Sequence, residues 1–322
     1  MFLPMTKLVL SLILSCAAVL LLSAHVTSIS AAEPSSNTLD WMKGDEESKP
    51  ESKPSKISHE ASVDYSFVAA AEVRQGDRVL GDTNVQTSSF IYVASIPVAK
   101  AWRLRTGMAW DRFSFGNPDN APLPDTLQST TLVLGADVEL SDKWLMRFEF
   151  QPGIYSDFEN VDSNDFNVPM IFGFSYIVDR NLQWVFGAQV NLFNAIPVMP
   201  GAGVRWQFAD AWTLSLIFPQ PRITYKINEQ WQVYAGGELK GGSYRTGNDF
   251  GTNSGNPALN NALVNYTEIR AGAGFSYKIH PAVTVDLDGG WVVSRSYDYF
   301  RADTKMKSDG APYAQVALKA KF

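Results

Sequence analysis

The chain has 322 residues, a formal net charge of −6 and a single cysteine, Cys16. A net negative charge argues against a nucleic-acid partner, which would favour a basic surface. Beyond residue 32, no stretch approaches the roughly 18 consecutive apolar residues of a membrane-spanning helix. Any insertion of this chain into a membrane must therefore use strands.

The first 32 residues have the layout of a secretory signal peptide. Lys7 precedes an apolar run over residues 8–22, and small and polar residues lead to Ser30-Ala31-Ala32. A lipidated Cys16 is the alternative, although Leu14 stands where a small residue is preferred. Residues 33–60 are rich in Pro, Ser, Lys and Glu, so they bury too little apolar surface to repay their ordering entropy. We expect residues 1–32 to be removed and residues 33–60 to form a disordered periplasmic linker or docking segment.

Residues 61–322 consist of alternating apolar and polar runs that predict strands. Six connections between the runs are short and polar, and they alternate along the chain with a second class. This second class includes long connections rich in Gly, Asn, Asp and Pro, at 74–85, 115–127, 157–166, 243–262 and 296–310, and two short ones, near 191–196 and at 219–221. This is the arrangement of outer-membrane barrels, whose short turns face the periplasm. We predict an all-β fold: a transmembrane, antiparallel, up-and-down β-barrel of about fourteen strands. Twelve strands are the alternative if the short pair that flanks Pro219 and Pro221 does not span.

One face of the predicted strands carries large apolar side chains and no charge, whereas the other face is charged. A soluble β-sandwich would also alternate, with its apolar face buried. Fourteen strands, however, enclose an interior too wide to fill with apolar side chains, so lipid outside and a polar lumen inside fit better. The charged face includes Asp64 and Asp111, and the residues that we expect to line the lumen are Arg103, Arg105, Asp137, Glu139, Arg147, Glu149, Arg205, Arg222, Glu238, Lys240, Glu268, Arg270, Asp286, Asp288, Lys319 and Lys321.

Acids and bases are interleaved on this charged face, which suggests ion pairs between neighbouring strands. Hairpin register predicts that Asp137 lies opposite Arg147, and that Lys319 and Lys321 lie near Asp286 and Asp288. Two interpretations remain open. The pairs either line a wet pore and tune a weak ion preference, or they form a structural lining in a closed barrel.

The last twelve residues, Ala311–Phe322, alternate strictly and end in an aromatic residue. A final amphipathic strand that ends in Phe is the signal recognised by the assembly machinery of Gram-negative outer membranes. We therefore expect Phe322 to be an assembly signal, and the partners to be that machinery, outer-membrane lipid and small solutes.

The segment from Asn194 to Pro221 is less regular than the rest of the barrel. It contains four prolines and two glycines, Gly201 and Gly203, which interrupt ladder hydrogen bonds or mark bulges. A low wall on this side could admit an apolar ligand sideways from the membrane, and an unbroken ladder from Ile196 through Tyr225 would contradict this hypothesis.

Enzymatic and metal chemistry find little support in the sequence. His59 lies beside the linker, and His280 lies in a short turn, where a structural role is favoured over general-base catalysis. The acidic segment Phe158–Asp165 has oxygen ligands for Ca²⁺ but lacks the spacing of an EF-hand, so a solvated loop is favoured. We expect no enzyme activity, no metal and no cofactor.

Several blocks of the barrel are similar to a known family. They are QPGIYSDF at Gln151–Phe158, the segments Asp165–Gly187 and Ile196–Tyr225, and YAGGELKGGSYR at Tyr234–Arg245. These resemble an uncharacterised family of bacterial outer-membrane β-barrel proteins of unknown function. The resemblance implies the fold and an outer-membrane location, and it brings no substrate or site residue. We expect a pore or facilitator for small solutes or apolar molecules; the alternative is a closed structural or surface-interaction barrel that acts through its extracellular loops.

Overall fold

The computed structural model describes residues 56–118 and 121–322, so the expected signal peptide and most of the expected linker lie outside the described residues. β1 begins at Ser58, three residues before the expected start of the barrel at 61. The described elements are β1 (Ser58–Gln75), β2 (Arg78–Ala99), β3 (Trp102–Gly116), β4 (Thr126–Ser141), β5 (Trp144–Phe150), β6 (Gly153–Ser156), η3 (Ser163–Asp165), β7 (Phe166–Asn167), β8 (Met170–Ile177), β9 (Leu182–Val190), β10 (Val198–Ala209), β11 (Trp212–Ser215), β12 (Arg222–Lys226), β13 (Trp231–Arg245), α2 (Phe250–Asn253), η4 (Pro257–Leu259), β14 (Leu263–His280), β15 (Val283–Tyr299), β16 (Thr304–Ser308) and β17 (Ala311–Lys321).

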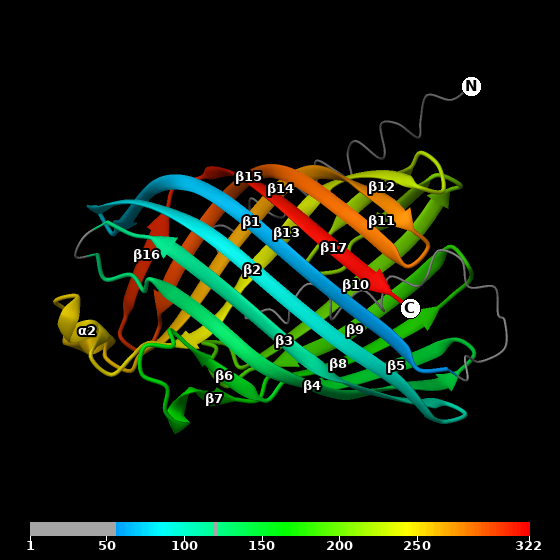
Figure 1. Ribbon diagram of the computed structural model, residues 1–322, viewed down its shortest axis with the longest axis horizontal. Helices are drawn as coiled ribbons and strands as arrows, with labels where there is room; N and C mark the ends of the chain where they lie inside the picture. The colour runs from blue at the N-terminus through cyan, green and yellow to red at the C-terminus, as the bar shows by residue number, and fades with distance from the viewer. Residues whose placement is uncertain (1–55, 119–120) are drawn as a thin grey trace. The chain divides into compact units, whose positions relative to one another are not determined.

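Fourteen antiparallel strands close into a barrel (Figure 1). The ring runs through β1, β2, β3, β4, β5, β8, β9, β10, β11, β12, β13, β14, β15 and β17, and it closes where β17 pairs with β1 from Glu60↔Lys321 to Val68↔Tyr313. The number is fourteen rather than twelve because the short strands β11 and β12 are paired on both sides. The predicted fold class is therefore confirmed. None of the helices in the described residues is long and apolar enough to cross a membrane.

The two ends of the barrel differ in their connections. The six short turns predicted from the sequence all lie at one end, which we call the short-turn end, whereas α2, β6, β7 and β16 lie at the other, the long-loop end (Figure 1). At the long-loop end the strands are longer than expected. Residues 78–85, expected to belong to a loop, continue β2 and pair with β1, and the turn between the two strands is only Gly76-Asp77.

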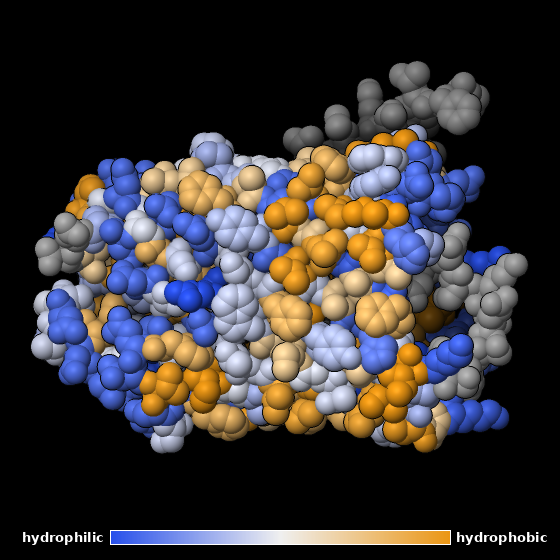
Figure 2. All heavy atoms as spheres, viewed as in Figure 1, coloured by the Kyte–Doolittle hydropathy of each residue, from blue (hydrophilic) through white to orange (hydrophobic). Residues whose placement is uncertain are grey.

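Large apolar side chains point outward along the predicted face. Val63, Met108 and Leu132 are each 50–55% exposed, and the tryptophans Trp102 and Trp206 are 44–45% exposed. In Figure 2 the visible face carries hydrophobic residues mainly over the half nearer the short turns, while hydrophilic residues gather toward the long-loop end. An apolar exterior around a charged interior is the pattern of a transmembrane barrel.

Nine strands form a second, smaller ring at the long-loop end, which we call the upper ring. β6 leaves the wall after β5, pairs with β4 from Gln128↔Ser156 to Thr131↔Gly153, and forms a parallel bridge with the end of β13 at Arg245↔Ser156. On the other side, β16 pairs with both β15 and β1. The upper ring therefore consists of β1, β2, β3, β4, β6, β13, β14, β15 and β16, and of the fourteen barrel strands it leaves out β5, β8–β12 and β17.

Apolar side chains fill the upper ring, and we call this cluster the aromatic plug. Its members share full or nearly full burial and include Val68, Val85, Phe113, Phe115, Leu127, Tyr244, Phe250, Leu259, Tyr266, Tyr297, Tyr299 and Met306. Ring centroids of Phe113 and Tyr266 lie 5.0 Å apart and those of Phe115 and Tyr297 lie 5.3 Å apart, both edge to face. The expectation of a polar lumen is thus wrong at the long-loop end, because a ring of nine strands is narrow enough for side chains to pack across it.

Candidate functional site

Below the aromatic plug, the lumen contains the charged residues that the sequence indicated. The first cluster joins β3, β4 and β5. The Nε and Nη2 atoms of Arg147 donate to the two carboxylate oxygens of Asp137 at 2.5 and 2.7 Å, a bidentate pair. The two residues are directly opposite in the hairpin, which confirms the predicted register. Arg105 is 2% exposed and its Nε donates to Glu149 at 3.4 Å, so this side of the lumen is filled by paired charges.

The second cluster centres on Arg270 of β14, whose side chain is fully buried. Its guanidinium lies 2.5 Å from Glu268 and 3.7 Å from Glu238, and it stacks on the ring of Tyr313 at 4.9 Å. Arg270 also donates to Ser66 of β1 at 3.2 Å, so it connects strands that are not neighbours in the barrel. These four partners hold the cation in place.

A trans-barrel ion pair lies beside this cluster. Nζ of Lys240 on β13 donates to Asp64 on β1 at 3.1 Å, and both residues are buried. Because three strands separate β13 from β1 in the ring, this contact crosses the lumen. The pair narrows the passage at this level.

The third cluster lies toward the short-turn end. Lys319 is 3.1 Å from Asp286, as predicted, but Lys321 lies 3.8 Å from Glu60 and not beside Asp288. The prediction for Lys321 is wrong because residue 321 is in register with Glu60 of β1, on the other side of β17. Asp288 instead accepts a hydrogen bond from the hydroxyl of Tyr234 at 3.2 Å.

The remaining expected lumen residues are Arg103, Glu139, Arg205 and Arg222. Arg222 stacks on the ring of Tyr234 at 5.0 Å. Arg103 is opposite Asp137 in the ladder, but among the described residues it has no carboxylate within 4.0 Å. Glu139 and Arg205 lie on the same inward face, nearer the short turns.

Two polar cavities interrupt the packed lumen. The lower cavity, of about 60 Å³, lies among β12–β15 and β17 and is lined by Arg222, Tyr234, Asp286, Asp288 and Lys319 among others. The upper cavity, of about 40 Å³, lies beneath the aromatic plug and is lined by Ser89, Asp111, Ser129, Asn191 and Ser243 among others. Asp64 and Glu238 line both cavities, so the two are adjacent and these carboxylates lie between them.

The wall of the barrel is incomplete between β10 and β13, and we call this gap the notch. β10 pairs with β9 from Val198 to Trp206 but with β11 only from Arg205 onward. β13 pairs with β12 only as far as Gly236, and backbone hydrogen bonds to Pro221 and Pro219 extend this contact to Leu239. Within the described residues, 198–203 of β10 and 240–244 of β13 therefore have no ladder partner on the sides that face each other.

The short hairpin β11–β12 causes the notch. A strand of 4 residues such as β11 rises about 13 Å, well below the ~25 Å apolar band of an outer-membrane barrel. Exposed apolar side chains surround the gap, with Leu192 at 66%, Val198 at 55% and Phe218 at 58% exposure. A Cβ placed on Gly201 would meet no atom within 4 Å, so open space adjoins β10 here. The ladder is thus broken where the prolines predicted it.

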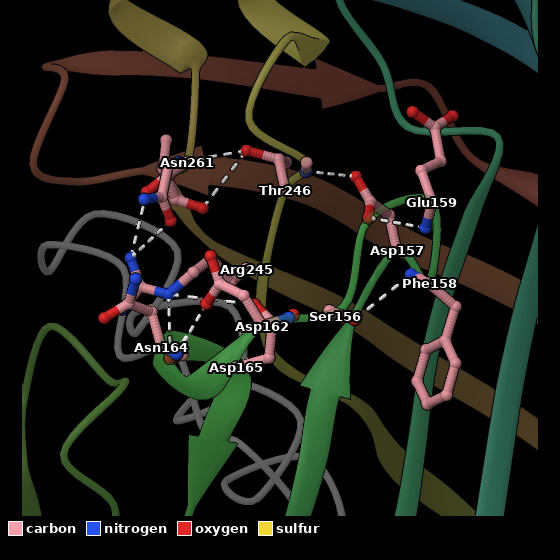
Figure 3. A network of polar contacts seen from close by, with 12 residues as sticks. Ser156, Asp157, Phe158, Glu159, Asp162, Asn164, Asp165, Arg245, Thr246 and Asn261 are labelled. Carbon is pink, nitrogen blue, oxygen red and sulfur yellow. Dashed lines mark hydrogen bonds and ion pairs between the residues drawn. The ribbon is translucent and has the colours of Figure 1, made fainter.

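A lid formed by residues 156–167 closes the long-loop end against β13 (Figure 3). The N–H of Asp157 donates to the carbonyl of Arg245 at 3.0 Å, and the N–H of Gly247 donates to the carboxylate of Asp157 at 2.5 Å. Arg245 in turn donates to the carbonyls of Asn164 at 3.0 Å and of Asn261 at 2.9 Å, and its guanidinium stacks on Phe193 at 5.1 Å. Arg245 therefore joins the lid to two further loops.

The lid is acidic, and its carboxyl groups are partly withdrawn from water. Burial raises the pKa of Asp157, although the N–H groups of Gly247 and Glu159 donate to its carboxylate. Burial likewise raises the pKa of Asp165, which lies 4.0 Å from Arg245. The closed lid therefore binds protons more readily than a solvated loop would.

The two histidines of the barrel occupy structural positions. Nδ1 of His280 accepts a hydrogen bond from the N–H of Ala282 at 3.2 Å within its turn. His59 contacts the hydroxyl of Tyr92 at 2.8 Å, and its ring stacks on Phe322 at 5.4 Å. In the described ranges, no three His, Cys, Asp or Glu side chains are grouped so that they could hold a metal ion, and this includes the acidic lid.

Sequence reasoning missed the lid contacts of Arg245 and the aromatic plug. A signal for the plug was present in the strand alternation. Phe113 and Phe115 lie two and four residues after Asp111, so they point to the same inward face. Tyr297 and Tyr299 stand in the same relation to Arg295. Apolar residues that continue a charged face toward a loop indicate a packed interior at that end. The partners of Arg245 lie 16 and 81 residues away and left no local pattern.

The closed ring, the apolar exterior and the charged interior define an outer-membrane type of β-barrel. Residues 62–319 match the family described as Domain of unknown function (DUF6268), and the chain belongs to this family. No curated protein matches the sequence.

Solved structures with a similar arrangement are outer-membrane barrels. An outer-membrane channel from Pseudomonas putida F1 is 11% identical, with 87% of this chain and 98% of that chain covered and a TM-score of 0.45. The toluene transporter TodX of P. putida is 10% identical over 84% of this chain and 91% of that chain, with a TM-score of 0.38. A FadL homologue from Pseudomonas aeruginosa is 10% identical, with coverages of 83% and 90% and a TM-score of 0.31.

Proposed function

We propose that this protein is a gated outer-membrane facilitator through which small solutes cross between the membrane exterior and the periplasm. The observation that carries the proposal is the pair of adjacent polar cavities that share Asp64 and Glu238 beside an incomplete wall. A barrel whose only role was structural would gain stability from a complete ladder and a dry interior. The Asp64–Lys240 pair, the aromatic plug and the lid are the three closures along this route.

Charged pairs in the lumen give the pore an ion preference in this proposal. Asp137 and Arg147 lie in the same lumen wall and neutralise each other, so replacing Asp137 alone with Asn keeps its shape and leaves the positive charge of Arg147 without this partner. We expect discrete single-channel conductance steps from the refolded protein in a planar bilayer, and a shift in reversal potential toward anion preference for Asp137→Asn. A folded but silent barrel would contradict the proposal.

The notch provides sideways access for apolar solutes in the same proposal. Because open space adjoins Gly201, a Trp at this position should fit without disturbing the fold and should fill the gap. We expect Gly201→Trp to reduce the uptake of a small apolar fluorescent solute into proteoliposomes several-fold. Gly201→Ala is the matched control and should transport like the wild type; equal uptake by all three proteins would remove the notch from the route.

A second candidate function is a closed structural or surface-interaction barrel that acts through its loops. The aromatic plug favours it, since Tyr266, Tyr297 and Tyr299 are fully buried and seal the long-loop end. The conductance experiment separates the two functions. We also propose that Phe322, whose backbone pairs with His59 at 2.6 and 2.9 Å, contributes the terminal aromatic signal for assembly, and that the linker before residue 56 lies in the periplasm.

A further inference from the structure

The upper cavity is lined by the carboxylate of Asp111, which belongs to none of the ion pairs described above. Asp111 lies on β3 between Ser89 of β2 and Ser129 of β4, each directly in register with it, and both hydroxyls hydrogen-bond to its carboxylate. Among the residues that the structure describes, Asp111 has no Lys, Arg or His nitrogen within 4.0 Å. It is therefore an inward acid with hydroxyl donors but no cation at contact distance.

The charges around this cavity do not balance. Four ionisable acidic or basic side chains line it: Asp64, Asp111, Glu238 and Lys240. Lys240 is held by Asp64 at 3.1 Å, and Glu238 lies 3.7 Å from Arg270, which pairs more closely with Glu268. The ammonium of Lys240 is thus in contact with Asp64 and reaches Asp111 only through its longer-range field, so the carboxylate of Asp111 has no cation at contact distance among the described residues. In a site with little water, the charge of this carboxylate favours a bound cation.

A second observation points to a ligand in the same cavity. Ser243 on β13 lines the cavity and is 1% exposed, and its Oγ has no hydrogen-bond partner. A buried hydroxyl without a partner is unfavourable unless a water or ligand supplies one. Amide side chains of Gln189 and Asn191 also line the cavity, so carboxylate, hydroxyl and amide oxygens surround it together.

We propose that the upper cavity is a binding site for a small monovalent cation, compensated by Asp111 and contacted by the hydroxyl of Ser243. Its volume of about 40 Å³ compares with roughly 10–15 Å³ needed for one water, so a cation of two or three heavy atoms fits and a bulky one does not. The role of this site rests on the proposed function, because a bound cation would make the proposed pore cation-selective. Its occupancy can nevertheless be measured without any transport.

The lower cavity supplies the path to this site. Asp286, Asp288, Glu238 and Asp64 line the lower cavity, and the last two also line the upper one. Carboxylates therefore follow one another toward Asp111, and an incoming cation can replace Lys240 as the partner of Asp64 on the way. Arg222 and Lys319 also line the lower cavity, but its four carboxylates outnumber these two bases, so the lining as a whole favours cations.

The test is an NMR titration of ¹³C-methylammonium into the refolded full-length protein. We expect saturable binding in the wild type, at least tenfold weaker binding in Asp111→Asn, and a smaller loss in Ser243→Ala. Asp210→Asn, an exposed acid in a short turn, is the matched control and should bind like the wild type. Tetraethylammonium, which is too large, should not compete.

Conductance recordings separate this inference from the proposed function. Methylammonium binding that depends on Asp111 in a silent barrel would support the site and contradict the pore. Conductance without such binding would support the pore and overturn the site. Equal binding by the wild type and Asp111→Asn would also overturn it, and a folded control spectrum for each variant excludes misfolding as the cause.

Discussion

Replacing Arg270 with Leu should lower the free energy of unfolding by about 3–5 kcal/mol, which is the typical cost of removing one partner from a buried charge pair. Arg270 is fully buried and is the cation for Glu268, which is also 0% exposed. Its loss would leave that carboxylate in the lumen wall with only the hydroxyl of Tyr266 as a close donor. Equilibrium urea unfolding in phospholipid bilayers measures the change.

The matched control is Arg112→Leu, the same change at an exposed arginine on β3 whose Nε donates only to Ser114 at 3.2 Å. Surface changes of this kind usually stay within about 0.5 kcal/mol. Adding Glu268→Leu to Arg270→Leu should recover part of the loss, because both charges are then gone. Equal effects of Arg270→Leu and Arg112→Leu would contradict the assignment of Arg270 as a buried structural cation.

The number of strands and the side chains that face outward were predictable from the sequence, because contact with lipid restricts the residues that can face outward. Each membrane-facing position must be apolar, so Val63, Met108 and Trp206 mark the outward parity without knowledge of their neighbours. The Asp137–Arg147 pair was predictable for a related reason, since a short hairpin turn fixes register. Lys321 was misplaced because it can reach strands on either side of β17, and local pattern does not choose between them.

The upper ring could not be predicted from local pattern. Its closure depends on β6, a strand of four residues just before the predicted loop, and on one bridge between Ser156 and Arg245. These residues are 89 positions apart, and polar lid residues outside the membrane carry no alternation that would reveal the pairing. The upper cavity was missed for a similar reason, because its lining combines residues from opposite walls.

Removing the side chain of Arg245 should open the lid and increase conductance. The Arg245 guanidinium makes charged hydrogen bonds to Asn164 and Asn261, each worth about 1.5–3 kcal/mol. Losing them in Arg245→Ala should raise the open-to-closed ratio of the lid at least tenfold, since 1.4 kcal/mol corresponds to a factor of ten. Faster hydrogen exchange at the N–H of Gly247 and a higher open probability in bilayer recordings are the two measurements.

Arg74→Ala is the matched control, because Arg74 is a half-exposed arginine at the same end of the barrel that pairs only with Glu72 on its own strand. Arg74→Ala should change neither the hydrogen exchange at the N–H of Gly247 nor the open probability. If Arg245→Ala speeds exchange without raising conductance, the lid opens but the aromatic plug below it remains the barrier. If neither readout changes, the lid is not held by Arg245.

The same lid should close more tightly in acid. Burial raises the pKa values of Asp157 and Asp165 in the closed lid above the ordinary carboxyl value of 3.8. The closed state therefore binds more protons than the open state, and closure is favoured most below about pH 4 and less as the pH rises through the raised pKa values. Open probability should accordingly rise from pH 4 to pH 7. In Asp157→Asn, which can still accept the N–H of Gly247, this rise should be smaller; an unchanged pH profile would assign the titration to other groups.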